Sequence, residues 1–323
     1  MHLLIPYAYC HQEACRQAFH RLALPKLRQL LTRLRAEAVV DTDGGDEWTL
    51  SPPHERVHAR ALGLPSDDGR IPWAAWQALH APPPQSAELA SRGAWGFLSP
   101  CYWQAGMDRL TMQGPNLPEL TEAESHALMG TLAQFMQQDG IALHFDRPDR
   151  WRIHGELLRE LATASLDRVL GQDLAPWLTR QGDTTAWQRL QSELQMLLYA
   201  HPVNDERAAR GAPIINAVWL HGTGNLPERY DQAVSAESAL IVADSLRARA
   251  LTQDWPAWGR AWQELDATLC DDLLARALRG DTVRLSLCGQ RQARAWVSQA
   301  PALSRRLRAL FGAAPDLTPL DTL

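Results

Sequence analysis

Short strand-like runs alternate with amphipathic helical segments along this chain, and this alternation restricts the fold more than any other feature of the sequence. The runs LLIPYAY (3–9), IINAVWL (214–220) and ALIVAD (239–244) are apolar enough to be buried strands. The run TVRLSLC (282–288) alternates in hydrophobicity, as a half-buried strand does. Alternating strands and helices are typical of α/β proteins. We therefore predict an α/β fold.

The predicted helices have apolar residues at helical spacing and recognisable ends. They span about residues 22–35, 121–138, 186–200 and 257–279. Thr121 and Glu124 have the spacing of a capping box at the start of the second helix, and Gly140 follows its end. Pro202 ends the third helix, because a residue that precedes proline disfavours the α conformation. The remaining predictions are a polar loop at 41–48, a Pro-rich break at 81–86 and an amphipathic helix around 305–308.

Composition and charge exclude several classes of function. The chain has 323 residues, of which 46% are hydrophobic and 21% charged, and its net charge is −5. Its composition therefore gives no basic surface for nucleic acid, and no apolar run approaches the roughly 20 residues of a membrane span. The N-terminal MHLLIPYAYCHQ lacks the positive region of a signal peptide. We expect a cytoplasmic protein with reduced, scattered cysteines and with neither nucleic acid nor membrane as a partner.

The sequence HERVH (54–58) matches the HExxH pattern, in which two histidines one helical turn apart bind zinc. A zinc site needs a third ligand, and only His80 or Glu88 follows nearby. The alternative is a charged helix start, with Glu55 near the positive end of the helix dipole. Prolines before the motif and Gly63 soon after it leave room only for a short helix, so we favour this alternative.

The stretch HPVNDERAARGAPIINAVWLHGTG (201–224) has polar and glycine-rich ends and an apolar centre. After the helix end, the pattern predicts an arginine-bearing turn, a buried strand and a Gly-x-Gly loop. In doubly wound sheets, loops at the carboxyl ends of strands bind ligands, and glycines let backbone amides approach an anion. Arg207 or Arg210 is the candidate cationic partner of that anion. The predicted ligand-binding residues are His201, Asn204, Arg207, Asn216, His221, Gly222 and Gly224.

A structural role is the alternative for each of these residues. The asparagines then fix turns, the glycines supply positive φ angles, and His201 is a hydrogen-bonded interior histidine. For any single residue the pattern favours the structural role. The combination of arginines with glycines in one stretch favours a ligand.

The same stretch resembles archaeal-type cofactor-independent phosphoglycerate mutases, whose corresponding segment is roughly HPVN..R...G..PAN.IW.WG.G. Weaker resemblances occur in family order at 23–31, 120–132, 146–153 and 238–251. The chain is more closely similar to the RpfE-type regulatory proteins of proteobacteria, through SPPHER, LDRVLGQ and LQSELQMLL. The resemblance implies a bacterial protein with an alkaline phosphatase-like α/β fold, in which helices flank a largely parallel central sheet. It implies a single domain over 1–323, with a smaller inserted α+β region at about 107–185.

In this family two metal ions, held by aspartate and histidine, activate a serine or threonine that carries the phosphoryl group. The family's first metal-binding aspartate follows the first strand, where this chain has PYAYCHQEA (6–14). Cys288-Gly289-Gln290 stand where the family has an Asp-His pair, and no histidine follows His221. These departures predict a protein without catalytic residues, metal ions or other cofactors. Its expected role is regulatory, through binding of a small phosphorylated ligand or a protein partner.

The alternative is an active enzyme, either a metal-dependent phosphoglycerate mutase or a phosphohydrolase. Such an enzyme would bind Mn or Zn through ligands that differ from those of the family. The candidates for these ligands are His11, Glu13, Asp41, Asp43, Asp46 and Asp108.

Overall fold

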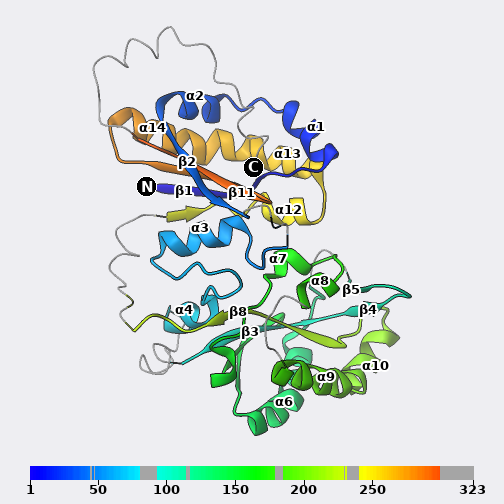
Figure 1. Ribbon diagram of the computed structural model, residues 1–323. Coiled ribbons are helices and arrows are strands. Elements are labelled where there is room, and N and C mark those ends of the chain that lie inside the picture. The colour runs from blue at the N-terminus through cyan, green and yellow to red at the C-terminus, as the bar shows by residue number, and fades with distance from the viewer. Residues whose placement is uncertain are drawn as a thin grey trace. The chain divides into compact units, whose positions relative to one another are not determined.

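The computed structural model describes residues 1–43, 46, 48–80, 93–113, 117–178, 185–228, 230 and 240–298 (Figure 1). The chain divides into two compact units. The first unit comprises Met1–Glu47, Pro52–Gly63 and Asp231–Leu323, and the second comprises Trp48–Ser51 and Leu64–Tyr230. The stretch 107–185, predicted as an inserted region, lies within the second unit. The predictions for 81–86, for 305–308 and for part of the loop at 41–48 fall outside the described residues.

A five-stranded mixed sheet, in the order β2-β11-β10-β1-β9, forms the centre of the first unit. Its strands are β1 (His2–Tyr9), β2 (Arg35–Thr42), β9 (Leu240–Val242), β10 (Arg284–Gly289) and β11 (Gln292–Val297). β1 pairs in parallel with β9 and β10, whereas β11 runs antiparallel to both β10 and β2. Parallel pairing, the expected arrangement, thus joins β9, β1 and β10, and β11 is the strand that runs against its neighbours. Gln290 and Arg291 alone connect β10 to β11, and so short a connection permits only an antiparallel hairpin.

Helices cover both faces of this sheet (Figure 1). They are α1 (Glu13–His20), α2 (Pro25–Arg33), α3 (Pro53–Ala61), α12 (Arg247–Leu251), α13 (Trp255–Leu265) and α14 (Asp271–Arg279), with a π-helical turn at Asp266–Cys270. Leu3 and Ile5 of β1 share a core with Trp258 and Trp262 of α13. The other face of β1 packs on α3, because Leu4 lies in a cluster with Val57. β1 is consequently buried along its whole length, as its unbroken apolar run predicts.

The second unit contains a four-stranded antiparallel sheet in the order β6-β7-β3-β8, and a two-stranded sheet. Its strands are β3 (Trp95–Cys101), β4 (Trp103–Ala105), β5 (Leu110–Met112), β6 (Ala142–Arg147), β7 (Arg150–His154) and β8 (Ala217–Gly224). Its helices are α4 (Trp73–His80), α6 (Glu122–Met136), α7 (Leu166–Val169), α8 (Ala175–Leu178), α9 (Thr185–Tyr199) and α10 (Pro202–Ala209). One face of the larger sheet packs on α6 and α9 through Trp151, Leu128 and Leu194. In Figure 1, α4 lies on the other side of β3 and β8 from α6 and α9.

The ends of α6 confirm two predictions. The Thr121 side chain accepts a hydrogen bond from the Glu124 N–H, and the Glu124 carboxylate accepts one from the Thr121 N–H, which completes the capping box. Gly140 has a φ of 72° and follows the 3-10 turn Gln137–Asp139 that extends α6. Local sequence therefore determines both ends of this helix.

Two predictions in the stretch 201–224 are wrong. The segment after His201 is the helix α10 and not a turn, because Pro202 occupies its first position, where its fixed φ suits a helix. The Gly-x-Gly segment is not a loop but the end of β8, in which His221 pairs with Phe97 and Gly224 pairs with Trp95.

Other boundaries shift by a few residues. α2 ends at Arg33, where the sequence pattern extends a helix to residue 35, and β2 follows at once. The predicted helix at 257–279 begins at Trp255 and is interrupted by the π-helical turn. All five cysteines are buried thiols. Within the described ranges, each helix is too short or too polar to cross a membrane.

Candidate functional site

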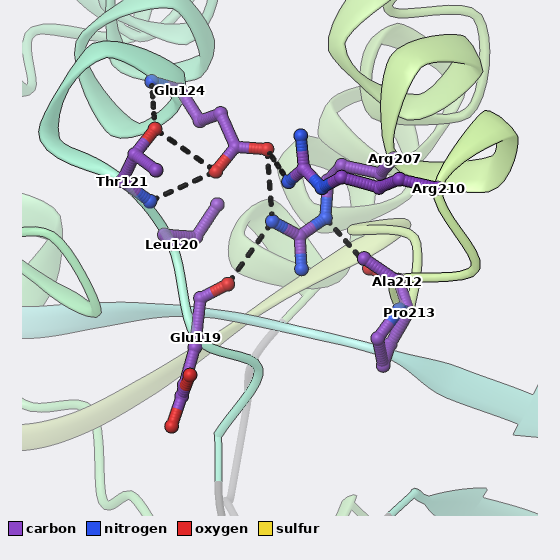
Figure 2. A pocket seen from close by; sticks show the side chains of 8 residues that line it. All are labelled: Glu119, Leu120, Thr121, Glu124, Arg207, Arg210, Ala212 and Pro213. Carbon is purple, nitrogen blue, oxygen red and sulfur yellow. Dashed lines mark hydrogen bonds and ion pairs between the residues drawn. The ribbon is translucent and has the colours of Figure 1, made fainter.

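The N-terminus of α6 and the C-terminal part of α10 bring a buried carboxylate, Glu124, next to two arginines. The capping box bends the Glu124 side chain back toward Thr121, so that the carboxylate lies beside the first turn of α6. Arg207 and Arg210 are three positions apart on and just after α10, which places them on the same side of that helix. Figure 2 shows both guanidinium groups directed toward the Glu124 carboxylate.

Each oxygen of Glu124 accepts more than one hydrogen bond. Oε2 accepts from the Thr121 N–H at 2.8 Å and from the Thr121 hydroxyl at 3.0 Å. Oε1 accepts from Nη1 of Arg207 at 3.0 Å and from Nη2 of Arg210. Burial of the carboxylate raises its pKa, but hydrogen bonds from Thr121, Arg210 and Arg207 outweigh burial and lower the pKa of Glu124 to about 2. Glu124 is therefore ionised throughout the neutral pH range.

Arg207 is the most deeply buried cation of this site, with only 1% of its surface exposed. Its Nε donates to the Pro213 carbonyl at 2.7 Å, and its Nη1 also donates to the Glu119 carbonyl at 3.0 Å. Its Nη2 makes no hydrogen bond with any residue that the structure describes, and the same holds for Nε and Nη1 of Arg210. The site thus has guanidinium N–H groups that remain available to an acceptor.

A pocket of about 540 Å³ opens beside these groups (Figure 2). It is lined by Glu119, Leu120, Thr121, Glu124, Arg207, Arg210, Ala212 and Pro213. The Glu119 side chain is exposed, and in Figure 2 its carboxylate is directed away from the guanidinium groups. One buried carboxylate therefore faces two arginines, which leaves an excess of positive charge at the pocket wall. Such a wall suits an anion.

Of the predicted ligand-binding residues, Arg207 lines the pocket, and the others do not. His201 caps α10, with Nδ1 accepting from the Val203 N–H at 3.2 Å and Nε2 lying 3.1 Å from the Thr131 hydroxyl. Asn204 is buried and bridges two backbone segments. Its amide nitrogen donates to the carbonyls of Leu198 and Ile215, and its oxygen accepts from the Ile215 N–H. These hydrogen bonds hold α10 in place and thereby position Arg207.

The remaining predicted residues lie on or beside β8. The Asn216 side chain pairs with both backbone groups of Trp103, at 2.7 and 2.8 Å. Nε2 of His221 lies 3.1 Å from the Ser99 hydroxyl oxygen. Gly222 and Gly224 have positive φ angles of 62° and 133°, and a Cβ atom at either position would lie 3.0–3.2 Å from neighbouring side chains. The positive φ angles and the close packing thus explain why glycine suits both positions.

Sequence reasoning recognised Glu124 only as a capping residue and Arg210 only as one possible cation. The capping-box spacing is the signal that fixes where the Glu124 carboxylate lies. No local pattern indicates that this carboxylate meets Arg207, because the two residues are 83 positions apart. Glu119 and Pro213 contribute backbone carbonyls, which carry no sequence signal at all.

Two candidate metal ligands of the first unit, Asp41 and Asp43, are ion-paired with arginines. Asp41 is ion-paired with Arg56 at 2.8 Å and with Arg60 at 3.4 Å. Asp43 is ion-paired with Arg291 at 2.5 Å. In the described ranges, no three His, Cys, Asp or Glu side chains are grouped so that they could hold a metal ion.

The HERVH residues 54–58 lie in α3, a helix of the predicted short type. The His54 ring contacts the Tyr7 ring, with centroids 5.4 Å apart. Burial, followed by the charge of His54, lowers the pKa of His58 to about 4. The His58 ring is therefore mostly neutral near pH 7. Glu88, one candidate third ligand, falls outside the described residues.

No protein-family model and no curated protein matches the chain. Among solved structures, the chain is similar to the cofactor-independent phosphoglycerate mutase from Thermoplasma acidophilum, with 11% identity and a TM-score of 0.35 over 93% of this chain and 90% of that one. It is also similar to the PH0037 protein from Pyrococcus horikoshii, with 11% identity and a TM-score of 0.42 over 93% and 87% of the two chains. The sequence identities and TM-scores are too low to support any conclusion about the activity of this chain. The RpfE-type and alkaline phosphatase-like assignments remain predictions.

Proposed function

We propose that the chain is a non-catalytic, regulatory binding protein whose ligand is a small phosphorylated molecule held in the pocket at Arg207 and Arg210. The observation that carries this proposal is the imbalance at Glu124, where one carboxylate faces two guanidinium groups with unused N–H donors. Arginine binds phosphate through paired N–H groups, and hydrogen bonds of this charged type are among the strongest in proteins.

The two arginines have different roles in this proposal. Arg207 is buried and fixed by backbone carbonyls, so it supplies a rigid positive charge. The Arg210 side chain is 48% exposed and is bonded only to Glu124 among the described residues, so it is free to turn toward a ligand. Leu120 and Pro213 at the pocket wall provide an apolar surface for the rest of the molecule.

The non-catalytic part of the proposal is supported by the surroundings of Asp41 and Asp43. Both carboxylates are ion-paired with arginines, which would compete with a metal ion for the same oxygens. The departures from the family motifs at 6–14 and 288–290 support it as well. A protein that binds a phosphorylated molecule without converting it can report the concentration of that molecule.

The test is calorimetric titration of the full chain with 3-phosphoglycerate and with inorganic phosphate. Saturable binding is expected, and Arg210→Ala should weaken it at least about tenfold, the equivalent of one charged hydrogen bond. Arg189→Ala is the matched control, since Arg189 is also half-exposed and paired with a carboxylate of another element, Asp139. Equal binding by Arg210→Ala and Arg189→Ala would refute the assignment of the pocket.

Turnover is measured separately on the same preparation. The chain should convert no 3-phosphoglycerate when manganese is added, and EDTA should leave ligand binding unchanged. Metal-dependent conversion that EDTA abolishes would instead support an active phosphoglycerate mutase or phosphohydrolase.

A further inference from the structure

The four-stranded sheet of the second unit has a second polar cluster, on the face opposite the α6 and α9 core. Side chains alternate along a strand, so Arg152 and its neighbours Arg150 and His154 face away from Trp151 and Ile153, which lie in that core. In the ladder, Arg152 lies directly opposite His144 of β6 on one side and Phe97 of β3 on the other. Basic and aromatic side chains are therefore gathered on one sheet face.

Arg152 is buried on that face. Only 5% of its surface is exposed, and its Nε and Nη1 atoms are buried without a hydrogen-bond partner among the described residues. Among the described residues its ion-pair partner is Asp146, at an Nε–Oδ1 distance of 3.7 Å. A guanidinium has five N–H donors, and leaving them unpaired in a protein interior is strongly unfavourable.

Asp146 cannot neutralise the charges of both Arg152 and Arg150, because its single carboxylate is paired with both. Nε and Nη2 of Arg150 lie 2.8 and 2.7 Å from Oδ2 of Asp146, and Gln77 of α4 donates to Oδ1 at 3.4 Å. Two arginines thus share one carboxylate. Two further acids lie near the cluster, and each is paired with another arginine: the exposed Glu156 with Arg159, and Asp149 with Arg147.

The histidines of the cluster add donors without adding charge. Burial, followed by the positive charge of Arg152, lowers the pKa of His144, and burial also lowers the pKa of His154. Both rings are therefore neutral near pH 7. Nε2 of His144 is buried without a hydrogen-bond partner within the described part of the chain. His144 and His154 are partly exposed, and β6 is an edge strand, so the cluster reaches the surface on that side.

We infer that this face is a second anion site, in which Arg152, His144 and His154 bind a phosphate group. A phosphate group has several acceptor oxygens and a negative charge, which match an unpaired guanidinium flanked by imidazole N–H groups. The phosphate group is either free inorganic phosphate or the end of a phosphate monoester. The site uses none of the residues that line the pocket at Arg207 and Arg210.

Thermal unfolding in the Arg210→Ala background tests this site while the pocket is impaired. Saturating inorganic phosphate should raise the Tm of Arg210→Ala by about 5 °C, the size expected for a ligand at about 100 times its Kd. It should leave the Tm of Arg210→Ala/Arg152→Met unchanged. Without phosphate, the double variant should unfold at the same or a higher temperature, because methionine removes an uncompensated buried charge. A double variant that responds to phosphate as fully as Arg210→Ala does would overturn the inference.

A spectroscopic measurement keeps the inference testable if Arg152→Met does not fold. The imidazole resonances of His144 and His154, assigned with His144→Gln and His154→Gln, should shift saturably on titration with inorganic phosphate. Arg152→Lys, which keeps the charge but loses the planar fork, should raise the Kd at least about tenfold. Unmoved resonances, or an unchanged Kd in Arg152→Lys, would refute the site.

A parallel titration with glycerol phosphate distinguishes the two sources of the phosphate group. Shifts with both compounds assign the site to phosphate monoesters, and shifts with inorganic phosphate alone assign it to the free anion. Because the resonances report only on the sheet face, this inference and the function proposed for the pocket can fail independently.

Discussion

The indole Nε1 of Trp258 donates a hydrogen bond to the backbone carbonyl of Tyr7, at 3.0 Å, where β1 leaves the extended conformation. Tyr7 has a φ of 52°, an unusual value for a residue other than glycine, and the pairing of β1 with β10 shifts register between Ile5 and Tyr9. Trp262, one turn along α13, donates to the next carbonyl, that of Ala8, at 3.2 Å. Two indole N–H groups of one helix therefore bond the backbone carbonyls at the irregular end of the central strand.

Trp258→Phe should destabilise the first unit by about 1–3 kcal/mol beyond the loss of ring volume, because it removes the indole donor that bonds the Tyr7 carbonyl. Trp255→Phe is the matched control, since Trp255 lies on the same helix, is also buried, and makes no indole hydrogen bond within the described residues. Urea unfolding measures both. Equal losses in the two variants would mean that the hydrogen bond to Tyr7 contributes nothing.

Glu124→Gln should destabilise the second unit by about 3–5 kcal/mol, because it leaves Arg207 buried without a counter-charge. Glu156→Gln removes a carboxylate that is also paired with an arginine but is exposed, and it should change stability far less, because water screens such a pair. The comparison is made by urea unfolding at pH 7. Similar small effects in both variants would contradict the buried ion pair.

Stability should fall with acid in two separate pH windows. The folded-state pKa of His58 is about 4, and that of His2, lowered by burial and then by Arg284, is also about 4. As pH falls from about 6.5 to about 4, only the unfolded chain takes up these protons, so stability decreases. Glu124 has a folded pKa of about 2, so its contribution is complete above about pH 4.5 and is lost as pH falls toward 2.

The measurement is Tm as a function of pH. His58→Gln should reduce the slope of Tm with pH in the upper window, to which His2 still contributes, and Glu124→Gln should reduce the slope in the lower window. A wild-type profile with no slope between pH 6.5 and 4 would show that the buried histidines titrate normally.

Gly222→Ala should destabilise the second unit more than Gly211→Ala does, by at least about 1 kcal/mol. Both glycines have positive φ angles, of 62° and 72°, so both variants have similar backbone strain. Only at Gly222 would the new Cβ meet neighbours, Phe97 at 3.0 Å and Trp73 at 3.2 Å, whereas nothing lies within 4 Å at Gly211. Thermal unfolding gives the difference, and identical Tm values would contradict the packing described for β8.

Periodic, locally determined features were predictable from the sequence. The capping box of α6, the buried run of β1 and the helix ended by Pro202 depend on residues within a few positions of one another. The edge strand β2 was missed because most of its side chains are exposed, which leaves no apolar run to recognise. The predicted strands β1, β9 and β10 do pair in parallel, whereas the antiparallel β11, which follows β10 after a short connection, carries no apolar run to indicate it.

The candidate site was only partly predictable, for a different reason. Polar residues near glycines in 201–224 have the composition of a ligand site, but Asn204 and Asn216 use that polarity to satisfy nearby backbone groups. A side chain's partner, and not its type, decides between the two roles. Glu124 finds its partner Arg207 through the packing of α10 on α6, a tertiary contact that no local pattern encodes.

β1 lies between β10 and β9 in the sheet of the first unit, and this position determines when during synthesis the sheet can form. β1 leaves the ribosome long before the strands with which it pairs, because His2 pairs with Leu240 and Arg284, which lie in some of the last described segments to be made. The second unit, which ends at Tyr230, is complete before either partner strand exists. Joining such distant segments is entropically costly and slow. The apolar segment LLIPYAY of a growing chain therefore stays exposed until β9 and β10 have been synthesised. We expect aggregation of the nascent chain, and the need for a chaperone, to be greatest during this period.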